Sequence, residues 1–248
     1  MLILAVDTST RMGSAALLRD GKVLAEVSGY EETPYSTRLF RDVEQLQDRV
    51  NFSLHEVDLF AVGAGPGSFT GLRVGLTAVK AWAEVHQKPV AAISGLEAIA
   101  DESQTVLTRG TPSTTTSTTN PRYIVPFLDA RRRQIFGAVY GNVFPGGANL
   151  SLESDESILS PDEFLDMVKG KVAGSSVDFV SPTPEAISAA RIAEAFPGAR
   201  VIPVSAALAP AIGRLGFDRA KRGEVLDAIR LDANYVRRSD AEAAWKDG

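Results

Sequence analysis

The chain begins with apolar runs and turns that predict a sheet before any helix. Residues 2–6 are continuously apolar, as in a buried strand, and residues 14–18 and 22–28 flank Asp20-Gly21. Asp-Gly between two apolar runs is the strongest short signal for a β-hairpin. The pattern therefore predicts a first strand followed by a hairpin.

The apolar positions then take the period of a helix. In residues 36–50, Leu39, Phe40, Val43, Leu46 and Val50 fall on one helical face, with charged residues mostly elsewhere. Beyond this helix the pattern predicts alternating strands and helices. The predicted strands are 58–63 and 90–93, and the predicted helices are 69–86 and a helix that Ser94 caps and that runs to about residue 102.

The composition shifts at residues 108–121, which carry no apolar side chain and are expected to form an exposed, mobile surface loop. Strand and helix signals then start again. The predicted strands are 123–128, 134–140, one or two within 171–180, and 200–204. Turns are predicted at Gly141-Asn142 and Pro145-Gly146-Gly147. One helix is predicted to begin at Ser160-Pro161, and two more are predicted at 184–196 and 205–222. Both halves open with hairpin-like strands, so we expect a two-lobed α/β protein with related lobes.

Composition and charge narrow the classes of function. The 248 residues carry a net charge of −5, which argues against the broad basic surface of a general nucleic-acid binder. Two local basic clusters, Arg131–Arg133 and the C-terminal Arg230, Arg237 and Arg238, fit either a solvated surface or a contact with RNA. There is no cysteine, which excludes disulfides and thiolate chemistry, and no apolar run is long enough to span a membrane. A cytoplasmic protein is expected.

The stretch GAGPGSFTGLR, residues 63–73, resembles a phosphate-binding loop without matching one. The spacing of a P-loop and that of a dinucleotide-binding fingerprint both fail. A strand, a glycine-rich turn and a helix N-terminus remain, and such a turn exposes backbone N–H groups that favour an anion. The candidate contacts are Gly65, Gly67, Ser68, Thr70 and Arg73, although Ser68 or Thr70 can equally serve as a helix N-cap.

Two further features allow either a structural or a functional interpretation. Asp7, Thr8, Ser9 and Thr10 end the first strand, where they could hold a Mg²⁺–phosphate group or form an ordinary polar turn. The small residues Gly71, Gly75 and Ala78 form a stripe on the helix 69–86. Such a stripe permits close helix packing, inside the fold or across an interface.

Histidine chemistry has little support in the sequence. The only two histidines, His55 and His86, lie far apart in the chain, so a histidine-based metal site is not expected. A Ser-His-Asp hydrolase is poorly supported because no G-x-S-x-G motif occurs.

Three stretches together resemble the TsaB (YeaZ) family: ILAVDTST with GSAALLRDGKV, GAGPGSFTGLRVGLTAVKAWA, and LDARRRQIFGAVY. The closing Tyr235-Val236-Arg237-Arg238 with Ala241-Glu242 is similar to the family's C-terminal pattern. The resemblance implies a two-lobed actin/Hsp70-like (ASKHA, ribonuclease H-like) fold. One lobe would comprise residues 1–104 with about 206–248, and the other 105–205.

The resemblance also implies a role in making threonylcarbamoyladenosine at position 37 of tRNAs that read codons beginning with A. In this family the chain is a non-catalytic partner that dimerises with itself or with the catalytic, metal-carrying paralogue TsaD. The ATPase TsaE joins the complex. No cofactor is expected in this chain, whereas ATP or ADP and Mg²⁺ would act in the complex, which would also hold the tRNA.

The family's interface resembles a helical bundle of the two N-lobe helices. Here the interface would involve Leu39, Phe40, Val43, Leu46, Gly71, Gly75, Ala78 and Trp82. Two departures are that Tyr35 stands where the family usually has histidine, and that a threonine-rich insertion occupies 111–119. Alternative interpretations are an ASKHA-type ATPase or kinase that uses Asp7 and the glycine loop, and a glycopeptidase-like hydrolase.

Overall fold

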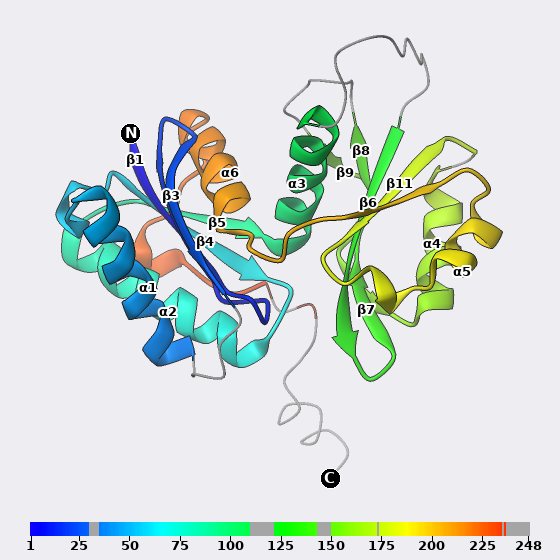
Figure 1. The fold of residues 1–248 in the computed structure, drawn as a ribbon, viewed down its shortest axis with the longest axis horizontal. Coiled ribbons are helices and arrows are strands. Elements are labelled where there is room, and N and C mark those ends of the chain that lie inside the picture. Colours follow the sequence, from blue (N-terminus) through cyan, green and yellow to red (C-terminus); the bar gives the residue numbers. More distant parts are fainter. Residues whose placement is uncertain (30–34, 110–121, 143–149, 173, 235, 237–248) are drawn as a thin grey trace. The chain divides into compact units, whose positions relative to one another are not determined.

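The computed structural model describes residues 1–29, 35–109, 122–142, 150–172, 174–234 and 236 (Figure 1). The contacts within the chain divide it into two compact units. The first unit comprises Met1–Ala98 and Ala206–Gly248, and the second comprises Ile99–Ser205. The predicted threonine-rich loop lies outside the described residues from position 110 onward.

The first unit contains a five-stranded sheet in the order β3-β2-β1-β4-β5. Its strands are β1 (Leu2–Asp7), β2 (Ser14–Arg19), β3 (Lys22–Ser28), β4 (Leu59–Gly65) and β5 (Val90–Ser94). β2 is antiparallel to β1 and β3, and β4 is parallel to β1 and β5. The predicted hairpin is confirmed, with φ of 50° at Asp20 and 77° at Gly21 in its two-residue turn.

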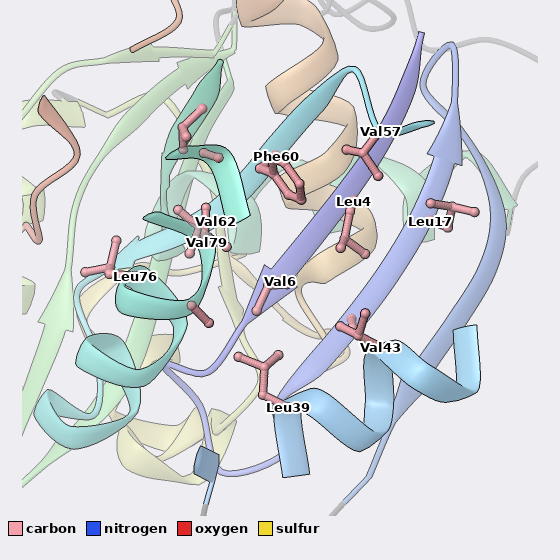
Figure 2. Packing of buried hydrophobic residues seen from close by; sticks show 14 of the residues in the cluster. Leu4, Val6, Leu17, Leu39, Val43, Val57, Phe60, Val62, Leu76 and Val79 are labelled. Carbon is pink, nitrogen blue, oxygen red and sulfur yellow. The ribbon is translucent and has the colours of Figure 1, made fainter. Parts of the chain in front are cut away.

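Helices cover both faces of this sheet. α1 (Tyr35–Val50) and α2 (Phe69–His86) lie on one face, and α6 (Ala209–Lys221) lies on the other (Figure 1). Figure 2 shows Leu39 and Val43 of α1 pointing toward Val6 and Leu17 of the sheet, within one buried cluster. Burying each such side chain stabilises the fold by about 1.5–3 kcal/mol. None of the described helices combines the length and apolarity that crossing a bilayer demands.

Short elements complete the first unit. The 3-10 helix η1 (Leu54–Glu56) follows α1, and the Glu56 carboxylate accepts a hydrogen bond from the Ser53 N–H at 2.7 Å. A second 3-10 helix, η3 (Ala228–Arg230), precedes a segment that runs beside β4 and α2. There the Asn234 N–H donates to the Ala64 carbonyl at 2.7 Å, and Lys80 Nζ donates to the Leu231 carbonyl at 3.3 Å. The family-like closing motif that follows lies outside the described residues except for Val236.

The second unit repeats this topology. Its sheet has the order β10-β7-β6-β11-β12, with the same alternation of antiparallel and parallel neighbours as the first sheet. The predicted relation between the halves is therefore confirmed at the level of topology. The strands are β6 (Arg122–Arg131), β7 (Gln134–Gly137), β8 (Tyr140–Asn142), β9 (Leu150–Leu152), β10 (Ser157–Leu159), β11 (Ser176–Ser181) and β12 (Arg200–Pro203).

Helices α4 (Pro161–Val172) and α5 (Ala189–Ala195) pack on the second sheet through Phe164, Val168 and Ile192. The predicted start of α4 is confirmed, since Ser160 and Glu163 exchange hydrogen bonds as a capping box. Across three neighbouring strands, the buried Asp178 carboxylate accepts hydrogen bonds from Arg122 and Arg200.

Several predicted boundaries are wrong. The expected strand 134–140 divides into β7 and β8, because its partner position, Pro126, has no N–H for the ladder. Gly141 and Asn142 belong to β8 and do not form the predicted turn. α3 (Gly95–Arg109) extends beyond residue 102. The predicted helix 184–196 becomes the 3-10 helix η2 (Pro184–Ala186) and the short α5, which Ser188 caps. The predicted turn at 145–147 lies outside the described residues.

Candidate functional site

Two loops that the sequence singled out separately lie against each other in the first unit. We call residues 7–10, which begin at the last residue of β1, and residues 65–68, which join the end of β4 to α2, the paired loops. The Ser68 N–H donates to the Ser9 carbonyl at 2.8 Å, and the Thr8 hydroxyl donates to the Gly71 carbonyl at 2.6 Å. Parallel pairing of β1 with β4 brings these strand ends to one edge of the sheet. Most of the predicted anion-site residues therefore come together.

The small residues of α2 make this close approach possible. A Cβ on Gly71 would lie 1.9 Å from the Thr8 carbonyl oxygen, and one on Gly75 would lie 2.4 Å from the Thr8 hydroxyl oxygen. Similarly, a Cβ on Gly67 would lie 2.6 Å from the Ser9 carbonyl oxygen. Gly71 and Gly75 thus pack against the loop after β1 in the same unit, and Ala78 is buried in the hydrophobic cluster of that unit.

Most residues of the predicted interface are buried in the isolated chain. The residues that the structure buries inside the first unit are Leu39, Val43, Leu46, Gly71, Gly75 and Ala78. Of the predicted set, only Phe40 and Trp82 retain exposed surface.

The paired loops enclose the Asp7 carboxylate. Asp7 is fully buried, and its Oδ1 accepts a hydrogen bond from the Ser9 N–H at 2.9 Å. Burial raises the pKa of Asp7, and the hydrogen bonds from Ser9 and Thr10 act in the opposite direction. Thr8 and Ser9 are also buried, and Ser9 Oγ has no hydrogen-bond partner among the described residues. In this arrangement the predicted Mg²⁺–phosphate ligands face the protein interior.

The other predicted anion contacts have different surroundings. Ser68 caps α2 by accepting the Gly71 N–H at 3.3 Å, so its role as an N-cap is confirmed. Thr70 is exposed, and the Arg73 guanidinium lies 3.9 Å from the centre of the Phe69 ring. Gly65 is buried, with the Asn234 carbonyl oxygen 2.9 Å from where its Cβ would lie. Of the predicted anion contacts, Ser68, Thr70 and Arg73 are therefore exposed and Gly67 is partly exposed.

Replacing Asp7 with asparagine should change how stability depends on pH. Burial raises the pKa of Asp7 in the folded state above its unfolded value of about 3.9. The contribution of Asp7 to the free energy of unfolding is therefore fully present below the unfolded pKa and is lost as the pH rises through the folded pKa. The Asp7→Asn variant should therefore gain stability relative to the parent as the pH rises from about 4 through the folded pKa of Asp7, by at most about 1.4 kcal/mol per pH unit. Urea unfolding at a series of pH values measures the difference.

Asp20 supplies a control of opposite sign for this experiment. Its carboxylate pairs with the N-terminal ammonium at 2.7 Å, and this hydrogen bond lowers the pKa of Asp20. The stabilisation from Asp20 is thus present above the unfolded pKa and lost as the pH falls through the folded pKa. Asp20→Asn should lose stability relative to the parent as the pH rises. A pH-independent difference for Asp7→Asn would contradict the assignment of a raised pKa.

Two side chains near the start of α1 hold this helix against the loop after β1. Arg38 is buried, and its guanidinium donates to the carbonyls of Met12 and Gly13 and to the Asp42 carboxylate at 3.1 Å. The Tyr35 hydroxyl donates to the Thr10 carbonyl. Tyr35, at the position where the family usually has histidine, therefore anchors α1 to the loop. The Arg-Asp spacing of i, i+4 was the only sequence signal for this anchor.

An exposed apolar patch lies beside this anchor, on α1 and α2. We define the α1/α2 patch as Phe40, Trp82 and Val85. Phe40 is 50% exposed and Val85 is 75% exposed, while Trp82 is half-buried. The rings of Phe40 and Trp82 meet edge-to-face with centroids 5.9 Å apart. Large exposed apolar side chains in contact with one another are typical of a protein-binding surface.

Both histidines contact neighbouring side chains of the first unit. His55 Nδ1 lies 2.7 Å from Ser53 Oγ, and the His86 ring stacks on Phe60 with centroids 6.5 Å apart. Within the ranges that the structure describes, no group of three or more histidine and carboxylate side chains could hold a metal ion.

Comparison with known proteins shows the family and the fold. Residues 32–197 match the family model described as "TsaD: tRNA N6-adenosine threonylcarbamoyltransferase". The chain is 29% identical over 249 aligned positions to the tRNA threonylcarbamoyladenosine biosynthesis protein TsaB of Bacillus subtilis, which covers 99% of this chain and 98% of that protein. It is 35% identical over 102 positions to the Escherichia coli protein of the same name, covering 40% and 43% of the two chains.

Solved structures show the same architecture. A Pseudomonas aeruginosa protein described as similar to peptidase YeaZ aligns with a TM-score of 0.73 and 25% identity, covering 95% of this chain and 99% of that chain. The ROK hexokinase of Thermus thermophilus aligns with a TM-score of 0.51 and 12% identity, covering 89% and 100%. The second likeness concerns the fold alone, and together they confirm the predicted two-lobed, actin-like α/β class.

Proposed function

The chain belongs to the TsaB (YeaZ) group of the family that the tRNA N6-adenosine threonylcarbamoyltransferase model describes, and on this premise we propose that it is a non-catalytic partner subunit in tRNA threonylcarbamoyladenosine synthesis. It would dimerise with a TsaD-like catalytic subunit, or with itself, and help to recruit a TsaE-like ATPase. Nucleotide, Mg²⁺ and tRNA would bind in the assembled complex, in the cytoplasm.

The α1/α2 patch is the observation that supports a partner role. Phe40 is half-exposed although it lies on a helix whose apolar face is otherwise buried, and Trp82 beside it keeps part of its surface exposed. Aromatic side chains of this kind often supply most of the binding energy of a protein interface. A partner helix laid along α1 and α2 would cover both rings.

An independent kinase or ATPase activity has less support from the geometry. Such an enzyme needs an accessible carboxylate near its phosphate or Mg²⁺. Asp7 instead lies under the paired loops, with its Oδ1 2.7 Å from where a Cβ on Gly63 would stand. The arrangement therefore favours a structural role for Asp7 over a catalytic one.

Reconstitution tests the proposal directly. Threonylcarbamoyl transfer to tRNA by TsaD-like and TsaE-like proteins should depend on this chain, and a size measurement should show a complex with the TsaD-like protein. Phe40→Glu should weaken that complex by on the order of 100-fold, since it places a charge in the centre of an apolar contact. Transfer should fall in parallel when the proteins are dilute.

Leu152→Glu is the matched control, because Leu152 is 51% exposed and lies on β9 in the second unit. It should leave complex formation and transfer unchanged. Transfer that proceeds equally well without this chain would reject the proposed function. Dependence on the chain with no effect of Phe40→Glu would instead show that the interface lies elsewhere.

A further inference from the structure

The turn between β6 and β7 presents three consecutive arginines in an uncommon backbone conformation. Arg131 pairs with Gln134, so Arg132 and Arg133 form a two-residue hairpin turn. The φ angles of Arg131, Arg132 and Arg133 are 64°, 55° and 58°, and all three residues are exposed. We call these three residues the arginine tip.

Arginine is an unfavourable choice for this turn. A hairpin turn with positive φ at both central residues favours Asn-Gly or Asp-Gly, because other residues lose energy in the left-handed region. The same chain uses that favourable chemistry at Asp20-Gly21, where φ is 50° and 77°. Each non-glycine residue in this conformation costs on the order of 1 kcal/mol. Stability alone would therefore favour a different sequence at residues 132 and 133.

The neighbouring strand end holds this turn in place. The Arg131 N–H donates to Asp129 Oδ1 at 2.8 Å, and the Asp129 N–H donates to the Thr183 hydroxyl at 3.0 Å. The Thr183 N–H in turn donates to Ser181 Oγ at 2.9 Å. These hydrogen bonds fix the backbone at the base of the turn that carries the arginines. Strained residues that surrounding structure maintains are often functional.

The charge of the arginine tip selects an anionic ligand. Asp129 Oδ2 lies 3.9 Å from Arg131 Nε. Arg132 and Arg133, at the end of the turn, add two more guanidinium groups on a protein whose net charge is −5. Guanidinium groups bind phosphate through paired, charge-assisted hydrogen bonds. A projecting turn suits the backbone of a large polyanion better than a small ligand, which needs an enclosing pocket.

We propose that the arginine tip is a contact site for the phosphodiester backbone of RNA. This inference rests on the proposed function, since a subunit of a tRNA-modifying complex works beside an RNA substrate. The contact positions RNA without reading its sequence, because phosphate contacts carry no base information. The site is therefore an electrostatic docking point, separate from the α1/α2 patch in its residues and in the partner it binds.

A turn-replacing variant tests this site without damaging the fold. Arg132→Asn with Arg133→Gly removes two charges and installs the residues that the turn prefers, so the variant should unfold at a temperature equal to or above that of the parent. Fluorescence anisotropy with a labelled tRNA transcript measures binding to the full chain and to its complex with the TsaD-like protein. Binding should weaken by at least about tenfold, and the slope of log affinity against log salt should fall by about 2.

Two controls separate charge from other effects. Lys169→Gln with Lys171→Gln removes the same charge from exposed positions of α4 in the same unit and should leave RNA binding unchanged. Arg132→Lys with Arg133→Lys keeps the charge and should retain most of the salt dependence.

Three outcomes would overturn the inference. The first is unchanged RNA affinity and salt slope in the turn-replacing variant, or no RNA binding by the parent chain and its complex. The second is that ATP displaces the RNA below millimolar concentration and that the same substitutions weaken ATP binding, which would assign the site to a nucleotide. The third is loss of protein assembly with RNA affinity intact, which would assign it to an acidic protein surface. If the turn-replacing variant loses RNA binding but threonylcarbamoyl transfer does not require this chain, the proposed function is rejected and the RNA contact site is retained.

Discussion

Gly71→Ala is expected to destabilise the protein by about 3 kcal/mol, which corresponds to a fall in melting temperature of about 6–12 °C. The added Cβ would stand 1.9 Å from the Thr8 carbonyl oxygen, a backbone atom that no side-chain rotation can move away. The first turn of α2 must therefore shift away from the loop after β1. That shift breaks the 2.6 Å hydrogen bond from the Thr8 hydroxyl to the Gly71 carbonyl. Thermal and urea unfolding measure the loss.

Gly170→Ala provides a matched control for this substitution. Gly170 also lies in a helix, α4, but nothing lies within 4 Å of the position that its Cβ would take. Alanine there should stabilise the protein by about 0.5–1 kcal/mol, because glycine is the poorer helix former. Similar effects of the two substitutions would show that contact with Thr8 does not determine the cost at Gly71.

Arg38→Met is expected to destabilise the protein by about 3–5 kcal/mol. Arg38 is 3% exposed and donates to the Asp42 carboxylate as well as to the carbonyls of Met12 and Gly13. Methionine fills similar volume but cannot donate, so Asp42 becomes a buried charge without this cation. The two carbonyls also lose a hydrogen-bond donor. Equilibrium unfolding in urea measures the change in the free energy of unfolding.

A double substitution distinguishes loss of pairing from loss of packing at this site. Arg38→Met combined with Asp42→Leu removes the Asp42 carboxylate together with the Arg38 guanidinium. Replacing both members of a buried pair is far less costly than replacing one. The double variant should thus be more stable than Arg38→Met alone. If the two substitutions add with no coupling energy, the ion pair is not the source of the stability.

Local pattern was enough to predict several elements of both units. The Asp20-Gly21 hairpin, the helix 69–86 and the capping box at Ser160 each depend on residues close together in the chain, and the structure confirms all three. Errors arose where a distant residue intervenes. The strand expected at 134–140 breaks opposite Pro126, which lies on a neighbouring strand and shows no effect in a local window.

The predicted site shows the same limit. The stripe of Gly71, Gly75 and Ala78 is visible in the sequence as a surface for close packing, but its partner is not. The structure places Gly71 and Gly75 against Thr8, which lies 63 positions before Gly71 in the chain. Arg38 likewise finds its acceptors at the carbonyls of Met12 and Gly13, which lie 26 and 25 positions earlier in the chain.

Periodicity, turn chemistry and family-like motifs in the sequence therefore specify the α/β class, the order of most elements and the family. Only the folded chain shows which surfaces are already occupied. Hydrophobic and small residues have the same local pattern whether they pack inside a unit or against another protein. The reason is that the hydrophobic effect is non-directional and favours burial of apolar surface against either. Tertiary contacts place Leu39, Val43 and the glycine stripe in the core and leave part of the surface of Phe40 and Trp82 exposed.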